Sequence, residues 1–307
     1  MLLIMKRINL FILLSALAFG AQAQQLTASS FYDMAPVLHN PAAAGTQNID
    51  GKHFSSLGGT FRKQWDGVPG GPQTGLVFGS TYLEKAKIGV GGYLYNDKTG
   101  PLTYNGLQLS VNYQIPMKNN AVLSLGLEGR AQQFQYDRAK LAAVLGPDNV
   151  LASDDKRLKG DAGFGVAYTA RKWQLGASVS QLIQSRLDLY SGTGNVVDES
   201  KMYRHYYAHG NYQWDVDKVT TIIPNLLVIY LPNAPTTVQG GVRVEHNDLF
   251  WYGLTRRSEQ SWMLSAGLHI KQKFNIGYSF DIYNKPIGIF DKGSNAHEVM
   301  LRYDFIR

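Results

Sequence analysis

From about His53 to the last residue, apolar and polar side chains alternate in about fourteen short stretches of the chain. The clearest stretch runs from Leu107 to Ile115, where every second residue is apolar and the residues between them are Gln, Ser or Asn. Because successive side chains of a β-strand point to opposite faces, this pattern predicts a strand with one apolar and one polar face. A soluble β-sandwich shows the same alternation, so strand length, strand number and the N-terminus decide between the two classes.

The predicted strands are about 9 to 16 residues long, whereas strands of soluble proteins average about 5 to 6 residues. Tilted strands of this length cross the apolar part of a bilayer. Gaps after every second strand are short and polar, and we expect them on the periplasmic side; the longest gap, 137–160, is expected on the outer side. The predicted strands lie near 53–64, 73–83, 87–97, 103–115, 121–136, 161–170, 173–188, 201–214, 218–231, 236–245, 249–257, 261–270, 274–283 and 296–306.

The N-terminus has the pattern of a secretory signal peptide. Lys6 and Arg7 precede an apolar run, and Ala21 and Ala23 stand where a signal peptidase reads small residues. After this run, no apolar stretch reaches the roughly 18 to 20 uninterrupted residues that a membrane helix needs. The sequence contains no Cys, so we expect neither a disulfide framework nor a lipidated N-terminal Cys.

Together these features predict an all-β protein, a transmembrane antiparallel outer-membrane β-barrel of about 14 strands. Its expected parts are a signal peptide (1–23), a periplasmic N-terminal segment (24–52) at the mouth of the barrel, and the barrel itself (53–307). The formal net charge of +7 includes Lys6 and Arg7 of the signal and is otherwise spread without a long basic run. A nucleic-acid partner is therefore not expected.

Three short motifs carry a family resemblance. They are Asn40-Pro41-Ala42-Ala43-Ala44-Gly45 after the signal, Arg62-Lys63-Gln64-Trp65 at the end of the first strand, and Asn96-Asp97-Lys98-Thr99-Gly100-Pro101 after the third. Together with the length and strand pattern, they strongly resemble the PorP/SprF family, outer-membrane components associated with type IX secretion and gliding motility in the Bacteroidetes. The resemblance implies a non-enzymatic barrel in the cell outer membrane, with no cofactor. Its expected partners are membrane lipid and other type IX secretion components or a large secreted adhesin.

These motifs supply the candidate binding or structural residues: Asn40, Pro41, Gly45, Arg62, Gln64, Trp65, Asn96, Asp97, Lys98, Gly100 and Pro101. The first motif is either a latch or partner contact in the periplasm, or a turn into the first strand, since Pro and Gly favour turns. The third motif is either an outer contact for a secreted partner or an ordinary tight turn.

Charged residues of both signs fall on the polar faces of the predicted strands. We expect them to pair and to fill the lumen rather than to line a wide aqueous pore, because an unpaired buried charge is costly. A selectivity ring or a cargo contact is the functional alternative. The inward set comprises Arg62, Gln64, Glu128, Arg130, Arg243, Glu245, Asp281 and Arg302.

Catalytic and metal chemistry have weak support in the sequence. His205 and His209 would lie about 13 Å apart on a strand, too far to share a metal ion. Ser265 and His269 share an inward face, but such pairs are common by chance, and no nucleophile elbow or phosphate loop accompanies them. We therefore predict a protein that is not an enzyme. The alternatives left open are a porin or hydrophobic-solute channel and, less favoured, an outer-membrane lipase.

Overall fold

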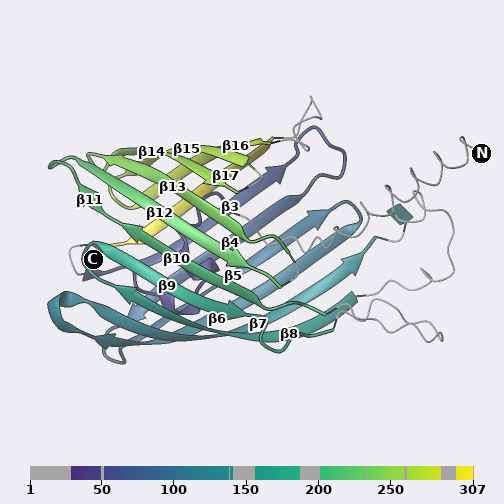
Figure 1. Ribbon diagram of the computed structural model, residues 1–307, viewed down its shortest axis with the longest axis horizontal. Helices are drawn as coiled ribbons and strands as arrows, with labels where there is room; N and C mark the ends of the chain where they lie inside the picture. Colours follow the sequence, from purple (N-terminus) through teal and green to yellow (C-terminus); the bar gives the residue numbers. More distant parts are fainter. Residues whose placement is uncertain are drawn as a thin grey trace, which may run out of the picture.

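The computed structural model describes residues 29–49, 52–137, 139–140, 156–186, 201–232, 234–258, 261–284 and 295–306. Fourteen long antiparallel strands follow one another around a closed barrel, shown from the side in Figure 1. The barrel closes where the last strand pairs with the first and Met300 lies opposite Thr60. The strands are β3 (Ser55–Gln64), β4 (Gln73–Leu83), β5 (Ile88–Thr99), β6 (Leu102–Pro116), β7 (Val122–Tyr136), β8 (Lys156–Thr169), β9 (Trp173–Ser180), β10 (His205–Tyr212), β12 (Thr220–Tyr230), β13 (Thr237–His246), β14 (Phe250–Arg257), β15 (Ser261–Ile270), β16 (Phe274–Tyr283) and β17 (Ala296–Phe305).

The predicted fold class and strand number are confirmed, while some strand ends differ. Strand β8 begins at Lys156 instead of 161, because its first residues continue the ladder with β7. Strand β9 ends at Ser180 instead of 188, since Gln181 and Gln184 take positive φ angles of 59° and 55° that interrupt the extended backbone. The expected signal peptide, 1–23, lies outside the described residues.

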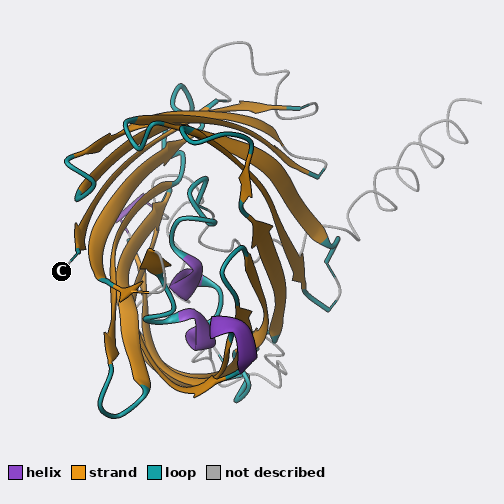
Figure 2. Ribbon diagram, turned by 90° about the vertical axis from the view of Figure 1, so that its left-hand side faces the viewer, coloured by secondary structure: helices purple, strands orange, loops and turns teal. Residues whose placement is uncertain are grey.

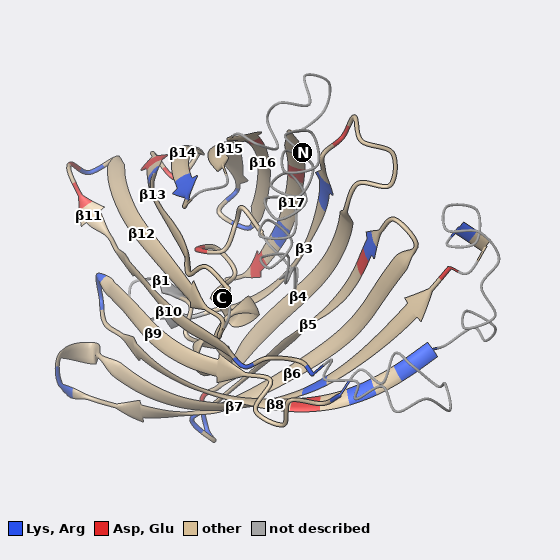
Figure 3. Cartoon of the chain, turned by 45° about the vertical axis from the view of Figure 1, so that its right-hand side comes forward, with Lys and Arg blue, Asp and Glu red and all other residues tan. Residues whose placement is uncertain are grey.

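The two faces of the barrel wall have opposite polarity, as the alternation predicts. On β6, Leu109 is 60% exposed whereas its neighbour Gln108 is fully buried. Figure 3 shows that charged residues lie mainly at turns and strand ends, with few along the middle of the strands. An apolar outside and a polar inside fit a wall that contacts lipid on one face and encloses a polar lumen on the other.

The turns divide the barrel into two ends. The short-turn end carries the connections at 84–87, 117–121, 170–172, 213–219, 247–249 and 271–273, and the long-loop end carries the other connections. A two-residue strand, β11 (Trp214–Asp215), pairs with β12 at the short-turn end. Nearby, the backbone N–H groups of Val219 and Thr220 donate to the Asp217 carboxylate and hold its pKa below the ordinary value. Among the described residues, no helix is long and apolar enough to cross a membrane.

Residues 29–47 lie inside the barrel, and we call them the lumen segment. Figure 2 looks into the barrel and shows the two short 3-10 helices of this segment, η2 (Pro36–Leu38) and η3 (Pro41–Ala43), enclosed by the strands. A small hairpin, β1 (Asn48–Ile49) with β2 (Lys52–His53), then leads into β3. An N-terminal segment was expected at the periplasmic mouth, and residues 29–47 of it lie in the lumen. Their side chains match the polar inner wall and a set of glycines described below.

Candidate functional site: a lumen occupied by the N-terminal segment

Glycines of β5, β7, β8 and β9 make room for the lumen segment. A Cβ on Gly126 of β7 would lie 2.6 Å from the Cα of Ala42, and one on Gly89 of β5 would lie even closer to the carbonyl oxygen of Ala44. A Cβ on Gly165 of β8 or Gly176 of β9 would instead meet the side chain of Asn40. A side chain at any of these sites would occupy space that the segment fills, so the inner wall is shaped for its close approach.

Asn40 attaches the lumen segment to the barrel wall next to these glycines. Its side-chain oxygen accepts from the backbone N–H of Ala42 at 2.9 Å and caps η3, where Pro41 takes the first helical position. Its amide nitrogen donates to the backbone carbonyl of Val166 on β8 at 2.9 Å and lies 3.0 Å from Nε2 of His209 on β10. Asn40 is fully buried, so it serves both the turn and the attachment to the wall.

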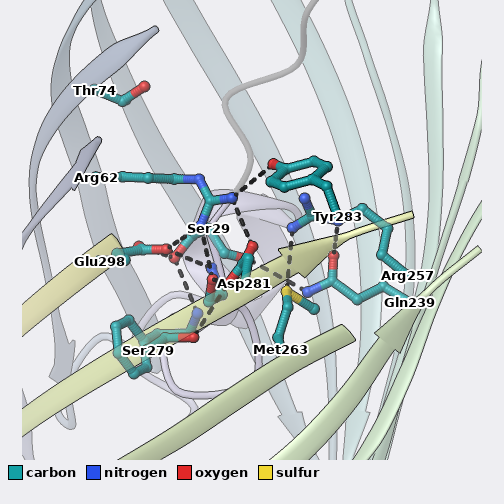
Figure 4. Close-up of polar contacts among 12 residues, drawn as sticks. Ser29, Arg62, Thr74, Gln239, Arg257, Met263, Ser279, Asp281, Tyr283 and Glu298 are labelled. Carbon is teal, nitrogen blue, oxygen red and sulfur yellow. Dashed lines mark hydrogen bonds and ion pairs between the residues drawn. The ribbon is translucent and has the colours of Figure 1, made fainter. Parts of the chain in front are cut away.

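Arg62 holds the other end of the segment, near the long-loop ends of β3, β16 and β17 (Figure 4). Its guanidinium donates to Asp281 at 2.6 Å, to Glu298 at 3.2 Å and to the hydroxyl of Ser30 at 2.9 Å. Glu298 also accepts from the Ser29 hydroxyl and the Ser30 backbone N–H, each at 2.7 Å. One buried arginine with two buried carboxylates thus links three strands to the first described residues of the segment.

Further contacts follow the segment through the lumen. Tyr32 donates to Asn225 of β12, and Arg243 of β13 donates to Asp33 at 2.9 Å. Arg302 of β17 donates to the backbone carbonyl of Met34 at 2.8 Å. Together with the contacts to β3, β8, β10 and β16 described above, these partners attach the segment to several separate strands of the barrel wall.

Apolar packing adds to these polar contacts. Phe31 meets Trp251 edge-to-face, with ring centroids 6.0 Å apart, in a cluster that includes Met34 and Met300. The Trp251 ring lies over Gly267, where a Cβ would approach the indole carbons to 2.5 Å or closer. The lumen is therefore a packed interior as well as a polar one.

A cavity of about 600 Å³ remains at the short-turn end, below the lumen segment. The segment contributes Asp33, Pro36 and Gln47 to it, and four of the short turns contribute its rim. A larger hollow of about 1880 Å³ lies on the outside of the barrel, where Phe61 and Leu301 line it. Since these side chains are half exposed and face lipid, the outer hollow belongs to the membrane contact surface and not to the lumen.

The structure places the three sequence motifs at different sites. The Asn40, Pro41 and Gly45 motif lies in the lumen, and two features require glycine at position 45: its φ is 65°, and a Cβ there would strike the backbone of Thr81. Arg62 points inward as predicted, whereas Gln64 and Trp65 end β3 without joining the Arg62 network.

The third motif forms the end of β5 and its turn. Asp97 points inward and accepts from Thr74 at 2.6 Å, while Asn96 points outward and donates to Asn105 at 2.6 Å. Gly100 has a φ of 56° and donates its N–H to the carbonyl of Gly70 at 2.8 Å, which joins this turn to the β3–β4 connection. Lys98 is exposed on the strand, and Pro101 completes the turn.

The expected pairing of inward charges is observed. Glu128 bonds Arg130 at 2.9 Å on β7, Arg302 bonds Asp304 at 2.8 Å on β17, and the remaining members pair as described above and below. Sequence reasoning missed Asp33, Glu298 and the inward glycines. A glycine on the polar face of a strand is the signal that would have revealed the lumen segment.

The residues considered for chemistry do not converge. His205 contacts the carbonyl of Tyr203 while His209 contacts Asn40, and the described hydrogen bonds join Ser265 to neither His nor acid. Within the described ranges, no group of three or more His, Cys, Asp or Glu residues is arranged to hold a metal ion.

Comparisons with known proteins agree with the fold. The chain resembles the CymD monoaromatic hydrocarbon channel, with 10% identity and a TM-score of 0.53 over 92% of this chain and 94% of that one. It also resembles the outer membrane protein Omp33 of Acinetobacter baumannii, with 8% identity and a TM-score of 0.47 over 83% and 98% of the two chains. No curated protein matches the sequence. Residues 21–303 match the family model described as type IX secretion system membrane protein PorP/SprF.

Proposed function

Because the chain belongs to the PorP/SprF family of type IX secretion membrane proteins and is an outer-membrane barrel, we propose that it acts by binding. In this proposal the barrel is an anchor or accessory component of type IX secretion and gliding motility, and it performs no chemistry of its own. It supports the export or surface attachment of a large secreted adhesin, together with other components of the secretion system.

The observation that carries the proposal is the occupied lumen. A channel for solutes needs a continuous aqueous path, whereas here residues 29–47 occupy the barrel with buried side chains, and Asp33 of the segment pairs with Arg243. Removing the segment would take the Ser29 and Ser30 donors from Glu298 and Asp281 and one carboxylate from Arg243, so its presence is part of the resting structure. A rigid, filled barrel suits a fixed point of attachment for a partner.

The rival is a porin or hydrophobic-solute channel, and conductance separates the two. Purified protein in planar bilayers is expected to give no steady open-state current, and a variant whose lumen segment is loosened by Gly126→Ala and Gly165→Ala is expected to give more. Large and steady currents from the unaltered protein would overturn the anchor role in favour of the channel.

A second experiment tests the partner class. Chemical crosslinking in cells followed by purification of the barrel should recover components of the secretion system or its adhesin. If neither co-purified, the partner assignment would fail while the barrel itself would stand.

A further inference from the structure

The cavity at the short-turn end lies between the short turns and the lumen segment. Its rim includes Lys172, Lys218, Asp248 and Gln272 from four different turns, while Gln47 and the rest of the lumen segment cover its inner end. Any ligand must therefore enter from the short-turn end, which we expect to face the periplasm. Its volume of about 600 Å³ lies within the range of ordinary ligand pockets.

The floor of this cavity is made by Asp33, Arg243, Glu245, Arg302 and Asp304 and carries one more negative charge than positive charge, whereas Arg171, Lys172, Lys218, Asp215 and Asp248 carry one more positive charge nearer the turns. Arg243 stands between two carboxylates, donating to Asp33 at 2.9 Å and to Glu245. Arg302 bonds only one carboxylate, Asp304, at 2.8 Å. Two arginines therefore serve three carboxylates, and each of the five side chains is at most 23% exposed. An excess carboxylate in a partly desolvated site favours the arrival of a cation.

Four buried side-chain oxygen atoms of residues that line the cavity also lack a hydrogen-bond partner in the described structure. Oδ2 of Asp304 accepts from Arg302 and Asn275, while Oδ1 of Asp304 has no partner. The side-chain oxygens of Gln47, Asn275 and Thr169 have none either. Such oxygens accept from N–H donors, and an ammonium or guanidinium group supplies several donors on one charged head.

We propose that this cavity is the receptor for a lysine or arginine side chain presented by a protein segment in the periplasm. The segment would lie across the short turns, and its cationic side chain would reach the floor between Glu245 and Asp304. This inference deepens the proposed binding function and rests on it, because it names the surface and the chemistry through which a secretion component would dock.

Short synthetic peptides provide the test. The pentapeptide Ala-Ala-Lys-Ala-Ala is compared with the same peptide carrying norleucine, which keeps the apolar stem and removes the charge, by calorimetry or by ligand-detected NMR on the full chain in detergent. We expect the lysine peptide to bind at least tenfold more tightly. The variant Glu245→Gln should reduce this preference to about threefold or less, and it leaves the Arg243 to Asp33 pair in place.

Two further variants make the result specific. Asp304→Asn should also weaken the preference, because it removes charge beside the unpartnered oxygen. Glu128→Gln is the matched control, since Glu128 is a buried lumen carboxylate paired with Arg130 on β7 and does not line the cavity; it should keep the full preference. Equal binding of the two peptides to the unaltered protein, or a preference that survives Glu245→Gln and Asp304→Asn, would overturn the proposal.

The same experiments separate this inference from the proposed function. If lysine shows no preference while secretion components still co-purify with the barrel, the cavity assignment fails and the binding role stands. If the preference holds while no secretion component co-purifies, the cavity is a cation-binding site and the secretion role fails.

Discussion

Replacing Gly126 with Ala tests whether the lumen segment lies against β7. The new Cβ would approach the Cα of Ala42 to 2.6 Å and the carbonyl carbon of Pro41 to the same distance. Both neighbours are backbone atoms of the segment and cannot rotate aside as a side chain would. The collision can be relieved only when the segment moves away from the wall. Gly129 on the same strand is the matched control, because it faces outward and a Cβ there meets no atom within 4 Å.

The expected magnitude follows from the cost of overfilling a packed interior. Adding a methyl group where no space exists costs about 1–3 kcal/mol. Replacing glycine by alanine also stabilises the barrel against global unfolding by about 0.4–1 kcal/mol through the lower entropy of the unfolded chain, but this gain does not enter the docking equilibrium of the segment. We therefore expect Gly126→Ala to weaken docking of the segment by about 1–2 kcal/mol, and Gly129→Ala to leave docking unchanged.

One introduced cysteine can report whether the lumen segment is docked, because the natural sequence contains no cysteine. Thr46→Cys places a thiol of similar size at a position that is 1% exposed in the lumen segment, so a maleimide reacts with it only after the segment has left the wall. A docking loss of about 1–2 kcal/mol raises the open population, and hence the labelling rate, by about 5- to 30-fold. If Gly126→Ala labelled no faster than Gly129→Ala, the placement of Ala42 against β7 would be refuted.

Three other changes test separate features of the barrel. Arg62→Met leaves two buried carboxylates unpaired and should lower the free energy of unfolding by about 3–5 kcal/mol in urea titrations of the protein in micelles; a loss below 1 kcal/mol would mean that the Arg62 network contributes little. Leu109→Arg places a charge on the lipid-facing wall and should cost about 2–4 kcal/mol in refolding into lipid vesicles, whereas equal stability would contradict the assignment of that face to lipid. Gly100→Val forces a branched side chain to a φ of 56° and should destabilise the turn by about 1–2 kcal/mol, seen as faster proteolysis there; unchanged proteolysis would argue against this backbone conformation.

The barrel itself was predictable because one physical rule governs every strand. A strand between lipid and a polar lumen must alternate, so the residues from Leu107 to Ile115 reveal both its existence and the direction of each side chain. The same rule predicted that Arg62 and Asp281 point inward. It did not predict that they meet, because they are separated by most of the chain and alternation within one strand says nothing about the relative height of two strands.

The lumen segment was missed because its residues look like an ordinary turn. Proline, alanine and glycine near Asn40 carry no periodicity, and nothing within 29–47 by itself distinguishes a segment inside a barrel from one outside it. The signal lies in the wall: once the strands are assigned, Gly126 and Gly165 both fall on inward faces, and the register makes them direct cross-strand neighbours. An inward glycine has no side chain to help fill the lumen, so adjacent inward glycines on neighbouring strands imply that another part of the chain takes the space. Because the Asn40 motif can make a compact 3-10 turn, and such a turn needs close walls to satisfy its polar groups, the glycines and the motif explain each other.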